Sequence, residues 1–293
     1  MNAMPDKPHT ATAPDWGTDV SSGKNKADEN FPVGSVLIAR ALRPHVHAYY
    51  DFARATDDIA DNALLSPEEK IARLDAMQAV LLGTREGADR ADVASAVRLC
   101  ASLAATGIVP ARGTDLIVAF RQDAVKQRYA SWAELANYCR YSANPVGLYL
   151  LDLHGESPAT HGSSDALCTA LQVLNHLQDC KADLLELGRC YLPEAWLAAE
   201  GEGVDAVRRE QASAGLRRVL DRALDEVDRL NREASRLPGL IADRRMRLEA
   251  AVIVGLSHRL ARRLRREDPL ARRVKLTRRD VGSALLAAAR HIL

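Results

Sequence analysis

The sequence predicts a single domain of the all-α class. Ala, Leu and Arg recur along the chain, whereas aromatic residues make up only 4% of it, and this composition favours helices over a β-rich fold. With 293 residues, of which 47% are hydrophobic, the chain is long enough to bury a sizeable core. Alternating strand patterns, internal repeats and breaks in composition are absent from the sequence, so we expect one folding unit.

Capping residues and helical spacing place the elements. In SPEEKIARLDAMQAVLLG, Ser66 is the expected N-cap and Pro67 the first helical residue. Glu69 completes a capping box and Gly83 ends the helix. Pro145 is expected to kink the helix in which it lies. Apolar spacing predicts the remaining helices at 92–106, 110–126, 131–152, 164–187, 205–236, 240–266 and 278–292.

The ends of the chain and its composition limit the class of protein. Residues 1–28 are polar and of mixed charge, so we expect a disordered N-terminal segment followed by a helical domain over 29–293. No apolar signal-peptide core and no run long enough for a membrane span is present, which predicts a cytoplasmic protein. The five cysteines form no CxxC pair and are expected to be reduced thiols. The net charge of +1 gives no global attraction to nucleic acid.

The stretch YYDFARATDDIADN crowds acidic residues onto one helix. Its polar side chains at steps of four, three and four share one face: Tyr50, Arg54, Asp57 and Asp61, with Asp58 beside them. Carboxylates at this spacing repel each other by about 0.2–0.5 kcal/mol per pair on an isolated helix. One such stripe alone is also typical of a solvated acidic face.

A second helix repeats the arrangement. In ALCTALQVLNHLQDCKADLLEL, polar residues at steps of three, four and four again share one face: Gln172, Asn175, Asp179 and Asp183. The rest of this helix is largely apolar, so its polar stripe is unfavourable unless the groups find partners. Two stripes with matched spacing therefore favour a shared function over two solvated faces.

A divalent metal is the simplest shared partner of the two stripes. Carboxylate and Asn carbonyl oxygens are hard ligands that suit Mg²⁺, which usually completes its coordination with water and substrate phosphates. Facing stripes would hold Mg²⁺ around one diphosphate, with Arg54 adding a bidentate contact. The apolar faces between the helices would accept a long hydrocarbon. This chemistry removes diphosphate from an allylic or cyclopropylcarbinyl carbon and shelters the carbocation.

Three motifs resemble the squalene/phytoene synthase family: YYDFARATDDIAD, YCRYSANPVG, and LQVLNHLQDCKAD followed by GRCYLP. The resemblance covers roughly residues 29–290, and the opening ENFPVGSVLIARALRPHV looks most like the hopanoid-pathway branch of squalene and hydroxysqualene synthases. It implies a single isoprenoid-synthase-type helical domain around a central cavity.

The resemblance also implies roles for individual residues. The catalytic residues would be Asp57, Asp61, Asp179, Asp183 and Tyr138, of which Tyr138 matches a tyrosine that assists ionisation and proton handling. The metal ligands would be Asp57, Asp61, Asn175, Asp179 and Asp183. The residues expected to bind substrate are Tyr50, Arg54, Asp58, Gln172, Arg189 and Tyr191.

Departures from the family pattern bear on the reaction. Ala27, Asn30 and Gln178 stand where many relatives carry His, Ser and Arg, and these changes affect the first condensation more than diphosphate removal. We therefore expect Mg²⁺-dependent ionisation of presqualene diphosphate to hydroxysqualene or squalene. The alternatives are a condensing synthase that makes presqualene diphosphate or a phytoene-like product, and a non-catalytic relative.

The terminating step depends on whether a nicotinamide cofactor takes part. Reduction to squalene needs NADPH, but the glycines of GEGVDA, Gly201 and Gly203, lack the strand that precedes a dinucleotide fingerprint. Family members bind NADPH without this motif, so NADPH remains an alternative. The sequence favours capture of the carbocation by water.

The last third of the chain is rich in arginine. SHRLARRLRREDPLARRVKLTRRD is either a solvated helix face or a segment attracted to an anionic membrane surface. No aromatic or Gly-rich module accompanies it, so nucleic acid is not an expected partner. In the final helix, Val281, Leu285, Ala289 and Ile292 are expected in the core rather than in a membrane. A partner synthase of the same pathway is a further partner to consider.

Overall fold

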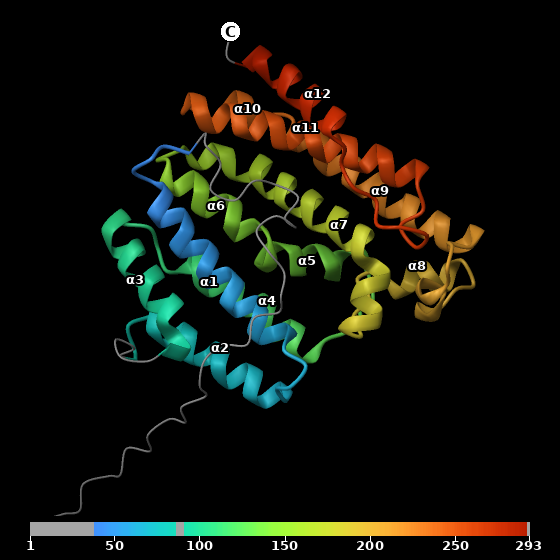
Figure 1. Cartoon of the computed structure of the whole chain (residues 1–293), viewed down its shortest axis with the longest axis horizontal. Coiled ribbons are helices and arrows are strands. Elements are labelled where there is room, and N and C mark those ends of the chain that lie inside the picture. Colours follow the sequence, from blue (N-terminus) through green and yellow to red (C-terminus); the bar gives the residue numbers. More distant parts are fainter. Residues whose placement is uncertain (1–37, 86–90, 292–293) are drawn as a thin grey trace, which may run out of the picture.

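The computed structural model describes residues 38–85 and 91–291 (Figure 1). These residues form helices joined by turns and contain no β-strand, so the predicted all-α class is confirmed. The predicted disordered segment 1–28, together with Ala27 and Asn30, lies outside the described residues. The helices are α1 Arg43–Asp61, α2 Pro67–Leu81, α3 Ala94–Thr106, α4 Ala111–Val125, α5 Trp132–Ser142, α6 Asn144–Leu153, α7 His161–Glu186, α8 Glu194–Ala199, α9 Ala214–Ala234, α10 Leu237–Leu240, α11 Arg244–Arg266 and α12 Arg278–Ala288.

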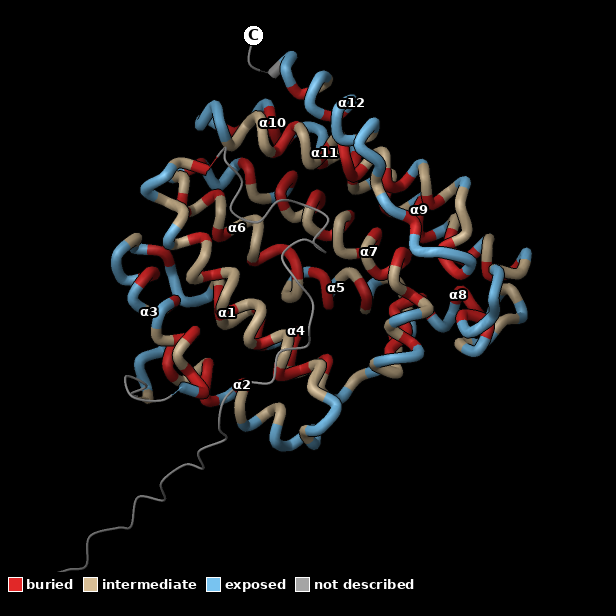
Figure 2. Tube along the Cα trace, in the orientation of Figure 1, coloured by how far each residue is buried: buried red, intermediate tan, exposed pale blue. Residues whose placement is uncertain are grey.

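The helix α7 lies at the centre of the packing. It packs against α5, α6, α9 and α11, while α1 packs against α2, α3 and α4 on the other side of the molecule. Figure 2 shows buried positions along α5 and α7 in the middle of the molecule. One buried apolar cluster joins α1 to α4, a second joins α4 and α5 to α7 and α9, and a third joins α7 to α10 and α11.

The capping box predicted at the start of α2 is confirmed. The Ser66 hydroxyl accepts the backbone N–H of Glu69 at 3.2 Å, and the Glu69 carboxylate accepts the backbone N–H of Ser66 at 2.8 Å. The backbone N–H groups of Ser66 and Glu69, which have no partner within the helix, are thereby hydrogen-bonded. Pro67 occupies the first helical position, where its missing N–H has no cost.

Two long predicted helices are divided in the structure. The segment 131–152 breaks at Ala143 into α5 and α6, because the backbone there leaves the helical region ahead of Pro145. The helix predicted over 205–236 starts too early: Val204–Arg208 is a 3₁₀ turn, and α9 begins only after its N-cap Ser213. The Ser213 hydroxyl accepts the Leu216 N–H at 3.0 Å, which fixes that start. The short helix α8 was not predicted.

The expectation that α12 buries its large apolar residues is wrong. Val281 is 39% exposed and Leu285 is 50% exposed, whereas Ala284 and Ala288 form the buried side of the helix. Ala289 is also exposed, and Ile292 lies outside the described residues. None of the helices that the structure describes is long and apolar enough to cross a membrane.

A close approach of α6 and α7 depends on Gly147. A methyl group built on Gly147 would lie 2.5 Å from the Ser164 hydroxyl and 2.6 Å from the Cys168 sulfur.

We therefore expect Gly147→Ala to lower the free energy of unfolding by about 1–3 kcal/mol in urea titrations, because α6 and α7 must separate. As a control on α7, Gly162→Ala meets no atom within 4 Å and should leave stability unchanged or raise it by up to about 1 kcal/mol. Equal effects of the two substitutions would contradict the close approach.

Candidate active site

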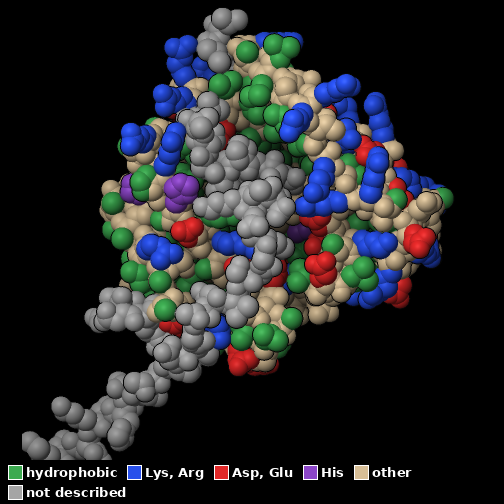
Figure 3. Space-filling view, in the orientation of Figure 1, with side chains coloured by type: hydrophobic (Ala, Val, Ile, Leu, Met, Phe, Trp, Pro, Cys, Tyr) green, Lys and Arg blue, Asp and Glu red, His purple; other side chains and the backbone are tan. Residues whose placement is uncertain are grey.

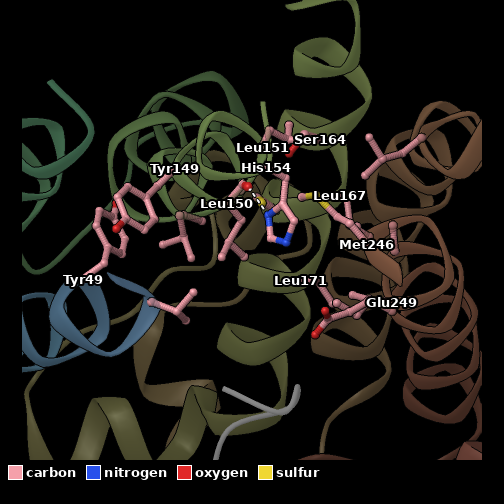
Figure 4. Close-up of a pocket in the computed structure, with 18 of the residues that line it drawn as sticks. Tyr49, Tyr149, Leu150, Leu151, His154, Ser164, Leu167, Leu171, Met246 and Glu249 are labelled. Carbon is pink, nitrogen blue, oxygen red and sulfur yellow. Dashed lines mark hydrogen bonds between the residues drawn. The ribbon is translucent and has the colours of Figure 1, made fainter. Parts of the chain in front are cut away.

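An apolar cavity of about 300 Å³ lies between α1, α6, α7 and α11 (Figure 4). Tyr49 and Tyr149 stack on one side with ring centroids 4.0 Å apart, and the Tyr149 hydroxyl donates to the His45 carbonyl at 3.0 Å. The dashed line in Figure 4 marks the 2.8 Å hydrogen bond between the His154 ring and the Leu150 carbonyl. Much of the remaining wall is aliphatic and includes Val46, Val146, Leu167, Leu171, Ile241 and Ile253. Such a cavity suits a hydrocarbon better than a polar ligand.

Both predicted stripes begin at the cavity wall. Tyr50 enters from α1, and Gln172 and Asn175 enter from α7. The Gln172 side-chain amide lies 3.2 Å from the His176 ring nitrogen. The aspartates of each stripe follow one to three helical turns further along α1 and α7. The acids therefore extend beyond the cavity at one end.

Guanidinium groups hold the acids of the first stripe. Arg54 lies 3.0 Å from Asp58 and 3.4 Å from Asp57 on the same helix. Arg189 reaches Asp61 from the chain just beyond α7, with an N–O distance of 2.6 Å and both side chains only 7% exposed. The repulsion expected among these acids is thus compensated within the protein.

Arg273 compensates the second stripe and was not predicted from the sequence. It lies in the connection between α11 and α12 and makes two contacts with Asp179, Nε to Oδ1 at 2.6 Å and Nη2 to Oδ2 at 2.8 Å. The backbone carbonyl of Asp183 accepts the Arg189 N–H at 3.1 Å, which brings Arg189 next to the end of this stripe. Arg273 is one of many arginines in its segment, and no local signal distinguishes it from its neighbours.

The donor atoms of the stripes fit Mg²⁺ only with a further ligand. Within residues 38–85 and 91–291, no group of three or more His, Cys, Asp or Glu side chains could hold a metal ion. The carboxylate and amide oxygens are nevertheless of the type that Mg²⁺ prefers. Phosphate oxygens of the ligand would supply the missing metal ligands. The same phosphate would attract the guanidinium groups that contact the aspartates in this structure.

Tyr138 and Tyr191 do not line the cavity but lie buried behind its polar end. The Tyr138 hydroxyl donates to Asp123 Oδ2 at 2.7 Å, and Tyr191 stacks on His176 with ring centroids 3.6 Å apart. Arg189 Nη2 donates to the Asp123 backbone carbonyl at 3.0 Å, which connects this cluster to the first stripe. Asp123 was missed because the sequence around it reads as an ordinary amphipathic helix.

Burial controls the charges of this cluster. It raises the pKa of Asp123 to about 6, although Arg189 and the hydroxyls of Tyr138 and Tyr191 act in the opposite direction. Burial, with Asp123 nearby, also raises the pKa of Tyr138 well above its ordinary value, so the hydroxyl keeps its proton. Burial and Arg189 lower the pKa of His176 to about 3, so its ring is neutral near pH 7. The result is a neutral tyrosine hydroxyl held by a buried carboxyl group.

An all-helical fold around an apolar cavity, with carboxylates and guanidinium groups at one end, defines an isoprenoid-synthase-type enzyme that handles prenyl diphosphates. Comparison with known sequences specifies the family. The sequence model that describes the squalene/phytoene synthase family matches residues 24–280, and the chain belongs to this family.

Individual relatives agree with this assignment. The chain is 41% identical over 261 residues to a hydroxysqualene synthase of Sinorhizobium fredii, covering 89% of this chain and 88% of that one. It is 42% identical over 259 residues to a hydroxysqualene synthase of Rhodopseudomonas palustris, covering 88% and 87% of the two chains. The crystal structure of a squalene synthase from Alicyclobacillus acidocaldarius superposes with a TM-score of 0.71 at 32% identity, covering 82% of this chain and 90% of that one.

The raised pKa of Asp123 gives a pH-dependent effect on stability. The folded protein binds this proton more tightly than the unfolded chain does, since the pKa rises from 3.8 to about 6. The stability that the proton contributes is present below about pH 4 and is lost as the pH rises through about 6. The Asp123→Asn variant has a side-chain amide, which cannot ionise. Its free energy of unfolding should therefore rise relative to the unsubstituted protein over this window, by on the order of 1–3 kcal/mol.

Urea titrations at several pH values would measure this difference. Asp205→Asn is a suitable control, because the Asp205 side chain is 93% exposed, and it should show no such trend. A difference between Asp123→Asn and the unsubstituted protein that does not vary with pH would contradict the buried, protonatable state of Asp123.

Proposed function

We propose that the protein ionises presqualene diphosphate and gives hydroxysqualene, with squalene as the product if a hydride rather than water ends the reaction. The observation that carries the proposal is the apolar cavity whose wall includes Tyr50, Gln172 and Asn175, the first residues of the two acid-bearing helix faces. The similarity to two hydroxysqualene synthases over most of the chain supports this particular reaction within the family.

Arginines would bind the diphosphate at the polar end of the cavity. Arg54, Arg189 and Arg273 each contact an aspartate of a stripe, and a phosphate group offers them equivalent or better acceptors. Mg²⁺, when held by Asp57, Asp61, Asn175, Asp179 and Asp183, would supply Lewis-acid stabilisation of the departing diphosphate. Tyr50 and Gln172 lie between these groups and the cavity, where they would contact the reacting end of the substrate.

The chain would then control where the carbocation reacts. The C–O bond breaks and its electron pair leaves with the diphosphate, while the aliphatic wall around Leu167 and Leu171 keeps bulk water away from the cation. Addition of one water and loss of its proton complete the alcohol. Tyr138, held by Asp123 close to Arg189, is the residue we expect to assist ionisation and to hold a proton near this end.

Water rather than a nicotinamide cofactor is the terminating reagent we favour. The loop with Gly201 and Gly203 follows the short helix α8, and Gly201 has a φ of +68°, which is typical of a residue that ends a helix. This context differs from the strand–turn–helix of a dinucleotide fingerprint. We retain NADPH as the alternative reagent.

The proposed substrate implies partners for the protein. A preceding synthase must make the cyclopropylcarbinyl diphosphate, and we propose that this partner enzyme belongs to the same pathway. Because both substrate and product are long hydrocarbons, we also propose peripheral contact with an anionic membrane surface through the basic C-terminal third.

A product assay tests the proposal directly. Purified protein, Mg²⁺ and presqualene diphosphate, with and without NADPH, should give hydroxysqualene in both cases. Asp57→Asn and Asp179→Asn should each lower turnover by about 100-fold or more, because each replaces a negatively charged carboxylate, which would hold the leaving group's metal, with a neutral amide that binds Mg²⁺ more weakly. Asp225→Asn, at a 63% exposed position on α9, is the matched control and should retain full turnover.

Each other outcome rejects a defined part of the proposal. Turnover that is indifferent to both stripe substitutions would reject the site. Products formed from farnesyl diphosphate alone would favour the condensing synthase instead. Squalene formed only with NADPH would replace water by hydride as the terminating reagent.

A further inference from the structure

The helix α12 presents an apolar face away from the protein. Leu286 is 77% exposed, Leu285 is 50% exposed and Val281 is 39% exposed. Ala289 is exposed as well and lies one turn beyond Leu285 on the same side. Figure 2 shows that most of α12 is exposed and that only short buried patches face α11. Adjacent exposed leucines on one helix are a larger apolar feature than the isolated surface residues found on most proteins.

Packing against α11 fixes this orientation. Ala284 and Ala288 are 0% and 2% exposed and form the contact side of α12. Ala284 meets Gly255 of α11 so closely that a methyl group built on Gly255 would lie 3.3 Å from the Ala284 Cβ. A seam of small residues has no room for a leucine side chain. The leucines therefore face outward because of the helix packing and not because the helix is loosely attached.

The surface around α12 is strongly positive. The segment 259–291 carries eleven Lys and Arg against three Asp and Glu, a formal charge of +8. Four of the arginines are paired with acids: Arg263 and Arg272 with Glu267 and Asp280 of the same segment, and Arg265 and Arg273 with Asp225 and Asp179 outside it. Even if these pairs are set aside, basic residues still outnumber acidic ones in the segment. Figure 3 shows Lys and Arg side chains along the upper edge of the molecule, over α10 to α12, with hydrophobic side chains between them.

The same edge reaches one end of the cavity. Leu240 of α10 is 42% exposed and lies between the exposed residues Arg236 and Arg244 in the sequence. On the other side of this short helix, Leu237 and Ile241 line the cavity. Both α10 and α12 pack against α11, and Figure 1 shows them along the same edge of the molecule. An apolar and basic surface therefore adjoins the cavity wall.

We propose that α10 and α12 form the docking surface of this protein for an anionic lipid bilayer. Leu285 and Leu286 enter the boundary between headgroups and acyl chains, while Arg278, Arg279 and Arg290 bind lipid phosphates. Charge complementarity favours an anionic bilayer over a second copy of the chain as the partner of this surface. A second copy of the chain would bring two positive faces together, and a bilayer rich in acidic lipid offers the opposite charge.

Docking has a consequence that rests on the proposed function. With α10 against the bilayer, the cavity wall formed by Leu237 and Ile241 lies next to the membrane. A long hydrocarbon substrate could enter, and its product leave, without passing through water. The docking surface itself does not depend on which reaction the cavity performs.

Vesicle flotation with the full chain tests the proposal. We expect binding to equimolar phosphatidylcholine–phosphatidylglycerol vesicles, little binding to phosphatidylcholine alone, and weaker binding as salt is raised. The double substitution Leu285→Ser, Leu286→Ser should weaken binding to the acidic vesicles by about tenfold or more. Arg278→Gln and Arg279→Gln should each weaken it by about fivefold. Leu64→Ser, at a position that is 84% exposed in the turn after α1, is the matched control and should bind unchanged.

Other results would overturn the docking surface. These are equal binding to neutral and acidic vesicles, or a double variant that binds as well as the unsubstituted protein. A dimer in solution that the same double substitution dissociates would assign the face to a second copy instead. Turnover of presqualene diphosphate in detergent should be unchanged in the variants. That readout separates failure of docking from failure of the proposed function.

Discussion

Repulsion among carboxylates on two helices is the constraint around which this molecule is arranged. The clearest response to it is Arg189, which contacts Asp61 at 2.6 Å and also donates to the backbone carbonyls of Ala60 and Asp123. These bonds join the end of α1 to α4 and to the chain just beyond α7. Loss of either partner of such a buried pair typically costs about 3–5 kcal/mol, because the other charge remains buried. The same group therefore stabilises the fold and positions the acids.

The charges also divide the molecule into ends with different chemistry. The acids lie along the C-terminal halves of α1 and α7, where Arg189 and Arg273 contact them from other segments. The N-terminal half of α7 contributes Leu167 and Leu171 to the apolar cavity. A ligand with a charged head and a long hydrocarbon matches both ends at once. The basic and apolar edge of α10 and α12 extends this division, because a ligand of that kind is poorly soluble in water and is found in membranes.

Local patterns predicted much of this organisation, and long-range contacts account for what they missed. The capping residues Ser66 and Glu69 are local, so α2 was predicted correctly from the sequence. The two stripes are also local, and both were found from residue spacing alone. Arg273 pairs with Asp179 across 94 positions of sequence, and Asp123 meets Tyr138 only after α4 and α5 pack. Likewise, the outward leucines of α12 follow from the contact between Gly255 and Ala284, which no helical periodicity encodes.

The most direct test of the central claim is to locate a metal ion. Crystals grown with Mn²⁺ and inorganic diphosphate would reveal the ion by its anomalous scattering. We predict Mn²⁺ bound between Asp57 or Asp61 and the face of α7 that carries Asn175 and Asp179, with phosphate oxygens completing its coordination. The guanidinium of Arg189 or Arg273 should contact the diphosphate. Mn²⁺ at another place, or diphosphate bound away from both stripes while Asp61 and Asp179 keep their arginine contacts, would contradict the account.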